Sequence, residues 1–394
     1  MDIAERLVAS RILPRDAAGA VLVGRAWVPG HVPGPSPVLV RGAEVVDLSS
    51  LAPTVSHLLN SEEPLARLQD ARHLPVIGGV DELLANSASS GSAGYARFLA
   101  PVDLQAVKAS GVTFVASLLE RVIEEQARGD PSRAKDIRDR ITSLIGGDLQ
   151  SIRPGSERAM ALKRMLIEQG AWSQYLEVGI GQDAEIFTKT QAMASVGVGA
   201  DVGILRTSSW NNPEPEVVLV TNGNGKVVGA TLGNDVNLRD YEGRSALLLG
   251  RAKDNNASSA IGPFVRLFDE RFTIDTVRTA ELTMRVEGRD GFGLEGHSSM
   301  SRISRDPLDL VAQAMNHHHQ YPDGVALFLG TMFAPTQDRG EPGGGFTHKV
   351  GDVVTISTPS LGALVNRVDY CDAIAPWTFG VGALMQNLAR RGVL

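Results

Sequence analysis

The sequence is almost without cysteine, since Cys371 is the single one among 394 residues. A lone cysteine excludes an internal disulfide framework and a thiolate metal site, and it is typical of a reducing compartment. The N-terminus, MDIAERLVASRILPRD, carries charges throughout and lacks the uninterrupted apolar core of a signal peptide. No run of about 18 apolar residues is present that could cross a membrane. We therefore expect a cytoplasmic protein with no membrane partner.

The chain also lacks an excess of positive charge. Its formal net charge is -7 and its isoelectric point is near 5.7. Proteins that bind nucleic acids use lysine and arginine to neutralise phosphates, and the sequence has no basic stripe for this purpose. We therefore expect no nucleic-acid partner. An acidic small molecule would need a local cation in order to bind.

Hydrophobic residues make up 43% of the chain, which is ample for a large core, and the length favours more than one domain. Short apolar runs within residues 18–48, broken by PGHVPGP, predict strands separated by a turn. Small, flexible residues gather near residues 90–94 and are typical of a linker. We expect a small N-terminal α/β domain over residues 1–95 and a larger second domain over residues 96–394.

The second domain combines helical and strand patterns. Apolar residues recur at three- and four-residue spacing in residues 113–128, 132–145 and 156–170, which predicts three helices. From Glu185 onward, β-branched runs alternate with Gly, Asn and Asp turns, and VVLVT-NGNG-KVVGATL predicts a hairpin. The expected fold class is α+β with a predominantly β second domain.

Two glutamates stand just before the first strand of this hairpin, in NPEPEVVLV. Side chains two residues apart on a strand point the same way, so Glu214 and Glu216 share a face, and the interposed prolines suit a strand end. Counting outward from the NGNG turn places residues 233–235 opposite residues 213–215, which brings Asp235 beside the pair. The hairpin therefore predicts three converging carboxylates.

Three carboxylates at close range have raised pKa values and destabilise the fold unless a cation lies among them. Oxygen ligands favour hard ions such as Mg²⁺, Mn²⁺ or Ca²⁺ over zinc, and three monodentate carboxylates leave about three octahedral positions for water or substrate. The residues alone leave a second interpretation open, in which a solvated strand start and an ordinary Asn-Asp turn hold no ion.

Several ordered motifs across roughly residues 101–367 resemble those of the fumarylacetoacetate hydrolase superfamily. NPEPEVVLV resembles its Glu-x-Glu metal strand, GNDVNLRD its third-ligand loop, and GRAKDNN the segment of its active-site lysine. Further resemblance lies in GVTFVASLLERVIEEQ, LEGHSSMSRIS, ALFLGTMFAPT and HKVGDVVTISTPSLGALVNRV. The resemblance implies a mixed β-roll catalytic domain, a homodimer or homotetramer, and Mg²⁺, with Mn²⁺ as an alternative, held by Glu214, Glu216 and Asp235.

One departure from the family bears on the reaction. Hydrolytic members have histidine three residues before the glutamate of the first helix, whereas this chain has Ser117 before Glu120. A serine hydroxyl is too weak a base to activate water unaided. The helical insert at residues 132–170 and the run DVNLRDYEGRSALLLGRAKDNNAS resemble the sugar-acid branch, whose dehydratases act on 2-keto-3-deoxy-pentonates of the D-arabinonate and D-xylonate type.

The resemblance therefore implies a lyase of pentose catabolism that converts a 2-keto-3-deoxy-D-pentonate to 2,5-dioxopentanoate. Loss of a C3 proton and of the C4 hydroxyl would complete this β-elimination, and a metal chelated by the 2-oxo acid would acidify C3. Two alternatives stay open. One is a C-C bond hydrolase of acylpyruvates or 2,4-diketo-3-deoxy sugar acids, which needs Glu120 with an ordered water, or another base, to replace histidine. The other is a metal-bound sugar-acid sensor or structural protein.

The resemblance also suggests roles for further residues. Lys253 is the first candidate to move a proton or to lie against the enolate oxygen, with a pKa lowered by a nearby bound cation. Glu120 is a candidate acid or base, and Ser117 shares its helix face. Arg239 and Thr331 are candidates for binding the substrate carboxylate.

Each of these residues also has an ordinary structural interpretation. Glu120 could be a solvated helix glutamate, Arg239 a partner in a surface ion pair, and Thr331 a turn hydroxyl. Lys189 falls where the family often has a lysine near the site entrance. A solvated lysine at a strand end is at least as good an interpretation of Lys189, so we do not include it among the catalytic residues.

Overall fold

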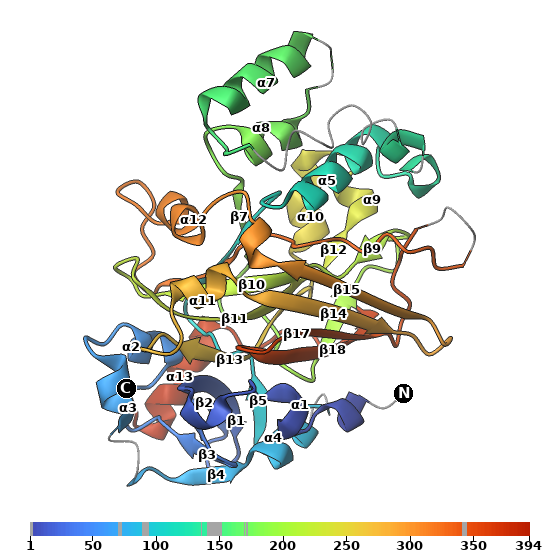
Figure 1. Cartoon of the computed structure of the whole chain (residues 1–394). Coiled ribbons are helices and arrows are strands. Elements are labelled where there is room, and N and C mark those ends of the chain that lie inside the picture. The colour runs from blue at the N-terminus through green and yellow to red at the C-terminus, as the bar shows by residue number, and fades with distance from the viewer. Residues whose placement is uncertain are drawn as a thin grey trace.

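The computed structural model describes residues 3–69, 73–88, 94–134, 136–139, 152–168, 170, 172–340 and 345–394. Figure 1 shows the N-terminal strands at one end of the molecule, the central sheets in the middle, and helices α5 and α7 to α10 at the other end. The expected linker near residues 90–94 and the second half of the expected helix at residues 132–145 lie almost entirely outside the described residues.

An 11-stranded sheet contains strands from most of the chain, in the order β4-β3-β2-β1-β13-β11-β10-β16-β6-β7, with β5 paired to β1 off this path. The N-terminal strands join the later ones through the antiparallel pairing of β1 with β13. The proposed domain division at residue 95 stays a prediction, and strands from both sides of it share this sheet. Its strands are β1 Leu22–Val28, β2 Gly34–Arg41, β3 Glu44–Asp47, β4 Val76–Gly79, β5 Arg97–Leu99, β6 Ala106–Ser110, β7 Ile186–Thr190, β10 Pro215–Thr221, β11 Val227–Asp235, β13 Ser259–Leu267 and β16 Val325–Phe328.

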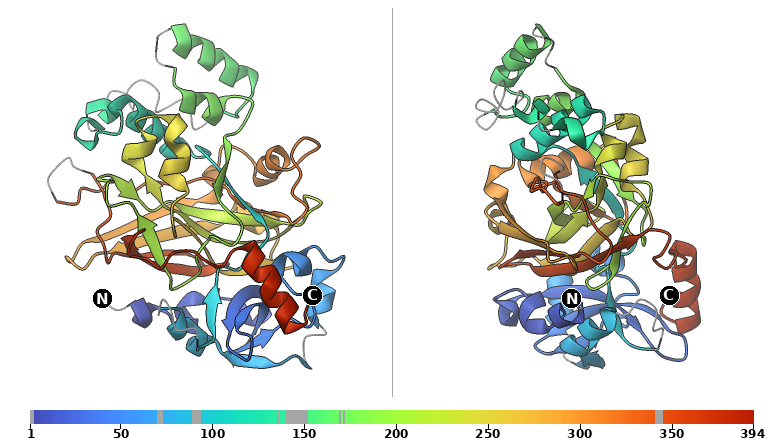
Figure 2. Two further views of the ribbon diagram at one scale, coloured as in Figure 1. Left: turned by 180° about the vertical axis from the view of Figure 1, so that it is seen from behind. Right: turned by 90° about the vertical axis from the view of Figure 1, so that its right-hand side faces the viewer.

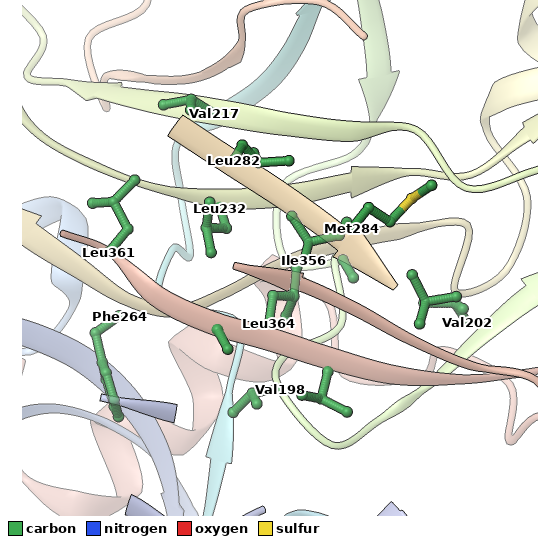
Figure 3. Close-up of a cluster of buried hydrophobic side chains, with 14 of the residues drawn as sticks. Val198, Val202, Val217, Leu232, Phe264, Leu282, Met284, Ile356, Leu361 and Leu364 are labelled. Atoms are coloured by element: carbon green, nitrogen blue, oxygen red, sulfur yellow. The ribbon is translucent and has the colours of Figure 1, made fainter. Parts of the chain in front are cut away.

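A five-stranded sheet, in the order β15-β14-β17-β18-β8, packs against the central strands of the large sheet. Figure 3 shows the core between them, where Val217 and Leu232 of the large sheet meet Met284, Ile356 and Leu364 of the smaller one. A two-stranded ladder, β12-β9, lies beside the start of β10. The bounds are β8 Asp201–Ile204, β9 Asn211–Asn212, β12 Asn237–Leu238, β14 Glu281–Glu287, β15 Gly293–Ser299, β17 Val353–Thr358 and β18 Gly362–Tyr370.

Strand β10 is buried on both faces because it lies inside the large sheet. Val217 and Leu219 belong to the core shared with the five-stranded sheet, whereas Val218 and Val220 pack into a second core on the other face. This alternation follows from the two-residue period of a strand. It fixes the face on which the two glutamates at the start of the strand lie.

The helices are mostly short, and many of them gather towards the two ends of the molecule (Figure 2), whereas α11 and α12 lie beside the central sheets (Figure 1). No helix in the described part of the chain has the length and apolar character that a bilayer crossing requires. Their bounds are α1 Ala9–Ile12, α2 Val55–Leu59, α3 Pro64–Gln69, α4 Val80–Ser87, α5 Val115–Ala127, α7 Glu157–Glu168, α8 Gln174–Ile180, α9 Arg239–Glu242, α10 Leu249–Lys253, α11 Ile274–Arg278, α12 Pro307–Ala314 and α13 Val381–Arg391, with 3-10 turns η1 Ile3–Arg6, η2 Ala17–Gly19, η4 Pro131–Arg133, η6 Ala246–Leu248 and η7 Met300–Arg302.

Helix α5 confirms the helix expected at residues 113–128, and α7 confirms the one expected at residues 156–170. Leu118 and Val122, four residues apart, are buried on one face of α5. The helix ends where Arg128 adopts a left-handed conformation with φ 55°. Contacts with α8 and α9 place α5 over the hairpin that carries the glutamates. Together the sheets and helices confirm the expected α+β class.

Candidate metal centre and active site

Three carboxylates meet at the rim of the β10–β11 hairpin. Glu214 directly precedes β10, Glu216 is the second residue of β10, and Asp235 is the last residue of β11. One carboxylate oxygen from each lies within 4.8 Å of the other two. Each residue is only 1% exposed. These three residues, called the carboxylate trio below, are brought together as the sequence predicts.

The expected register of the hairpin is wrong by one residue. Pro215 pairs with Asn234 rather than with residue 233, because a β-bulge between Val220 and Thr221 leaves Val228 as an extra residue in β11. The shift places Asp235 opposite Glu214, and the Asp235 N–H donates to the Glu214 carbonyl at 3.0 Å. Residues directly opposite on antiparallel strands present side chains to the same face. The bulge is therefore the reason that all three carboxylates share one face.

Two lysines approach the carboxylate trio from other elements. Lys253, at the end of α10, places its Nζ 2.5 Å from Glu214 Oε2 and 3.1 Å from Asp235 Oδ2. Lys189 of β7 places its Nζ 3.1 Å from Asp235 Oδ1 and also donates to the backbone carbonyl of Lys253. The interpretation of Lys189 as a solvated strand-end residue is wrong, because its side chain is fully buried. The lysine beside the trio that sequence reasoning set aside is therefore part of the site.

The three carboxylates of the trio differ in how far neighbouring positive charges balance their negative charge. Burial opposes ionisation of Glu214, but the charges of Arg121 and Lys253 outweigh it and lower its pKa to about 2. Glu216 accepts hydrogen bonds from the Gly330 N–H at 2.7 Å and the Thr331 hydroxyl at 3.2 Å, and it forms no ion pair with any described residue. Burial, together with the charges of Asp235 and Glu214, holds the pKa of Glu216 well above its usual range. Glu216 thus lacks a counter-charge that a bound cation would supply.

The donor set of the carboxylate trio fits a hard divalent cation. It consists of oxygen atoms alone, and such sets suit Mg²⁺, Mn²⁺ or Ca²⁺. The burial of an ionised carboxylate without a partner costs free energy, and the cost is removed when a cation is coordinated. Thr331 donates its hydroxyl to Glu216, so it supports a trio member directly.

Arg121 and Glu242 are site residues that the sequence analysis missed. The Arg121 guanidinium contacts Glu214, donates to Glu124 at 2.6 Å and lies 3.3 Å from Glu242. Burial raises the pKa of Glu242 to about 7, although the charge of Arg121 opposes the rise. A signal for Arg121 was present, because it follows the buried Leu118 by three residues and so points into the apolar face of α5.

The other predicted residues of α5 have partners within the protein. The Ser117 hydroxyl donates to the Phe114 carbonyl of its own helix at 2.8 Å. Glu120 accepts two hydrogen bonds from Arg138 and one from Arg239. Burial opposes ionisation of Glu120, but the hydrogen bonds and charges of these arginines prevail and lower its pKa. The interpretation of Glu120 as a solvated residue therefore does not describe its surroundings, and the catalytic roles of Ser117 and Glu120 stay predictions.

Arg239 is buried rather than engaged in a surface ion pair. It is 1% exposed, its Nε donates to Glu124 at 2.6 Å, and its Nη2 donates to Glu120 at 2.8 Å. The guanidinium also lies 4.3 Å from the ring centroid of Trp210. Arg239 therefore ties α9 to α5 beside the trio. Its role in binding a substrate carboxylate stays a prediction.

A cleft of about 740 Å³ adjoins the site. It is lined by Phe114 and Val115 at the start of α5, and by Met332, the residue after Thr331. The cations Arg153 and Arg302 also line it. The trio itself is not part of the lining, so in this conformation the carboxylates are closed off from the cleft. The cleft has room and positive charge for a small organic anion.

Comparisons with known proteins agree with this geometry. Residues 180–369 match the family model described as fumarylacetoacetate (FAA) hydrolase, C-terminal. A 2-dehydro-3-deoxy-D-arabinonate dehydratase of Saccharolobus solfataricus is 31% identical over 186 residues, which cover 47% of this chain and 58% of that protein. A probable 2-keto-3-deoxyxylonate dehydratase of Haloferax volcanii is 27% identical over 269 residues, which cover 68% of this chain and 73% of that protein.

A solved structure with the same fold is a 2-keto-3-deoxy-D-arabinonate dehydratase complexed with magnesium and 2,5-dioxopentanoate. Its TM-score is 0.60 at 20% identity, and the match covers 88% of this chain and 98% of that one. At this identity the likeness concerns the fold. The family match over residues 180–369 and the two relatives agree with the resemblance inferred from the ordered motifs: over these residues the chain is similar to the C-terminal part of fumarylacetoacetate hydrolase.

Proposed function

We propose that this protein is a Mg²⁺-dependent dehydratase that converts a 2-keto-3-deoxy-D-pentonate, of the arabinonate or xylonate type, to 2,5-dioxopentanoate. The observation that carries the proposal is the buried carboxylate trio with the Lys253 ammonium against two of its members. The names of the two curated relatives, and the magnesium and 2,5-dioxopentanoate named in the related structure, support the same reaction class.

In the proposed site, Glu214, Glu216 and Asp235 would hold Mg²⁺. The bound ion would withdraw electrons from the 2-oxo group of the substrate and so acidify its C3 hydrogens. Gly330 and Thr331 orient the Glu216 carboxylate through their hydrogen bonds. Lys189 forms an ion pair with Asp235 Oδ1 at 3.1 Å from the other side. These contacts hold the ligand oxygens in place before a substrate arrives.

Lys253 is the proposed proton-transferring residue. Burial opposes its charge, but Asp235 and Glu214 outweigh burial and raise its pKa above the ordinary value in the metal-free chain. A bound cation would weaken this stabilisation of the ammonium and favour the neutral amine. The Lys253 amine could then take the C3 proton and return it to the C4 hydroxyl, which would leave as water. The expected lowering of the Lys253 pKa concerns the metal-bound site and remains part of the proposal.

The surroundings of α5 favour dehydration over hydrolysis. Position 117 offers a hydroxyl bonded to the Phe114 carbonyl instead of an imidazole, and a hydroxyl does not deprotonate water near neutral pH. Glu120 accepts hydrogen bonds from Arg138 and Arg239, which makes its carboxylate a weaker base than an unpaired one. We therefore propose that Glu120 and Arg239 position α5 over the site, and that any contact of Arg239 with the substrate carboxylate replaces one of its present bonds.

The test is to incubate purified protein and Mg²⁺ with 2-keto-3-deoxy-D-arabinonate and 2-keto-3-deoxy-D-xylonate. Formation of 2,5-dioxopentanoate, absent when Mg²⁺ is chelated, would support the dehydratase. Pyruvate released from an acylpyruvate or a 2,4-diketo-3-deoxy sugar acid, with no 2,5-dioxopentanoate from the pentonates, would instead indicate the hydrolase. Binding of the pentonates without either product would indicate a sensor.

A further inference from the structure

A second cavity, of about 250 Å³, lies where the N-terminal strands meet the later part of the chain. Arg25 and Trp27 of β1 line it, together with Ser195 from the segment after β7 and with Trp377 and Phe379 from the segment before α13. Strands β1 and β5, which form one wall, are visible in the lower half of Figure 1. Its volume is below the roughly 300–1,000 Å³ of sites for drug-sized ligands, so it suits a smaller molecule.

Arg25 supplies a buried positive charge to this cavity. The residue is 4% exposed, its Nε donates to the Ala100 carbonyl at 3.0 Å, and its Nη1 lies 3.0 Å from the sulfur of Met193. A thioether is a weak acceptor, and no carboxylate among the described residues forms an ion pair with Arg25. Arginine stays charged in proteins, and a buried charge is normally paired. The guanidinium therefore has N–H groups and a charge that an anion could satisfy.

Asp103 influences Arg25 only through its charge. Its carboxylate accepts from the backbone N–H groups of Val55 at 2.6 Å, Ser56 at 2.9 Å and Leu104 at 2.8 Å. These bonds hold the carboxylate at the N-terminus of α2. Consistent with an incompletely compensated cation, burial lowers the pKa of Arg25 while the charge of Asp103 raises it.

The walls of the cavity are flat and aromatic. The Phe379 ring stands edge-on to Trp27, with centroids 5.5 Å apart, and the Arg97 guanidinium lies 5.3 Å from the Trp27 ring. The indole nitrogen of Trp27 is buried and has no hydrogen-bond partner among the described residues. An apolar body could pack on these rings, and the indole N–H is a second donor for a polar group.

From these contacts we propose that the cavity is a binding site for a small carboxylate with a flat apolar body. The carboxylate takes the free N–H groups of Arg25 in a charge-assisted pair, and the apolar body packs against Trp27 and Phe379. A neutral molecule of the same shape would leave the buried guanidinium without an anion, so charge and not shape alone decides binding.

This cavity is distinct from the proposed catalytic site but is connected to it. The Ser195 hydroxyl lies 3.0 Å from that of Ser259, and Ser259 pairs with Asp235 in the sheet. The inference does not depend on the proposed reaction, because no member of the carboxylate trio lines the cavity.

Isothermal titration calorimetry of the full-length protein with benzoate tests the proposal, with benzamide as the neutral probe of the same shape. We expect one benzoate per chain and at least about tenfold weaker binding of benzamide. Arg25→Met should weaken benzoate binding by at least about tenfold. Arg41→Met is the matched control, because Arg41 lies on the neighbouring strand β2 with a side chain 37% exposed and paired with Glu44. This control should bind benzoate as the wild type does.

Trp27→Phe keeps an aromatic wall and removes the indole N–H, so it should weaken benzoate binding to a smaller extent even if Arg25→Met does not fold. Glu216→Gln separates the two sites, and its benzoate affinity should equal that of the wild type. The proposal is overturned if the wild type does not bind benzoate, if benzamide binds equally well, or if Glu216→Gln abolishes binding. The proposal is also overturned if a second copy of the chain covers this cavity in solution and benzoate for that reason does not bind.

Discussion

Two clusters of buried charge differ in how completely their own residues balance them. In the first, the carboxylate trio, Glu216 has hydrogen bonds but no ion-pair partner among the described residues. In the second, the Asp352 cluster, Arg339 donates to both carboxylate oxygens of Asp352 at 2.6 and 2.8 Å. His348 Nδ1 and the Lys349 N–H complete the set at 3.1 and 2.9 Å.

The pKa shifts of Asp352 and Glu216 have opposite signs for this reason. Burial opposes ionisation of Asp352, but the bonds from His348 and Arg339 prevail and lower its pKa. Burial and neighbouring carboxylates raise the pKa of Glu216. A cluster that satisfies itself stabilises the fold, whereas a cluster that leaves a charge unbalanced is suited to take a ligand from outside. The comparison predicts opposite responses to matched mutations.

The largest expected effect is that of Glu216→Gln on the trio. Removal of one ligand charge should weaken Mg²⁺ binding by about 100-fold or more and abolish activity, while the metal-free protein keeps or gains stability. Calorimetry with Mg²⁺, the dehydratase assay and chemical denaturation in a chelator measure these quantities. Glu295→Gln is the control, because Glu295 is an exposed glutamate paired with Arg285. Unchanged Mg²⁺ affinity in Glu216→Gln would contradict the metal site.

Lys253→Met should separate metal binding from turnover. We expect Mg²⁺ affinity to be retained and kcat to fall by about 10²–10⁴-fold, the range of a positioned acid or base. Lys226→Met, a change of an exposed lysine in the hairpin turn, should alter neither quantity. If Lys253→Met and Glu216→Gln retain equal activity, the proposed division of roles is wrong.

In the Asp352 cluster the corresponding change should act on stability instead. Asp352→Asn leaves the buried Arg339 without its main counter-charge, so we expect a loss of about 3 kcal/mol in the free energy of unfolding. Mg²⁺ affinity should not change. Denaturant unfolding and Mg²⁺ titration of the same preparation test both statements. A fall in Mg²⁺ affinity without a loss of stability would show that the two clusters are not separate in the way inferred.

The smallest expected effect is on the pH dependence of stability. The pKa of Glu242 is raised from 4.5 to about 7 by burial, so the folded state holds this proton more tightly than the unfolded state. The resulting stability is present below pH 4.5 and is lost as the pH rises through about 7. In a chelator, Glu242→Gln should therefore lose less stability than the wild type between these pH values. Parallel curves for the two proteins would contradict the shift.

Much of the site could be predicted from local sequence patterns. The alternation of Glu214 and Glu216 before an apolar strand follows from strand geometry, and the NGNG turn fixes a hairpin that returns Asp235 to the same rim. Helix α5 follows from its apolar spacing. These features depend on neighbours in the chain, which a sequence displays directly.

The missed residues depend on contacts between distant segments. Lys189 is buried because β7 pairs with β6 and approaches Asp235, which lies far from it in the sequence. A lysine between two threonines carries no local sign of this burial. Arg239 is paired with Glu120 and Glu124, over a hundred residues away, instead of with its neighbours. Local patterns predict which residues are charged, but tertiary packing decides which charges meet.

The extra residue Val228 shifts the pairing of β10 with β11 by one residue, and this shift decides which face of the hairpin each later side chain of β11 occupies. If a relative lacked the extra residue at this bulge, the side chain of Asp235 would lie on the opposite face of the hairpin, even if all other residues of the hairpin were the same. Length variation here is therefore chemically more severe than most substitutions. Alignments that place gaps freely in this loop would pair aspartates that cannot serve the same purpose.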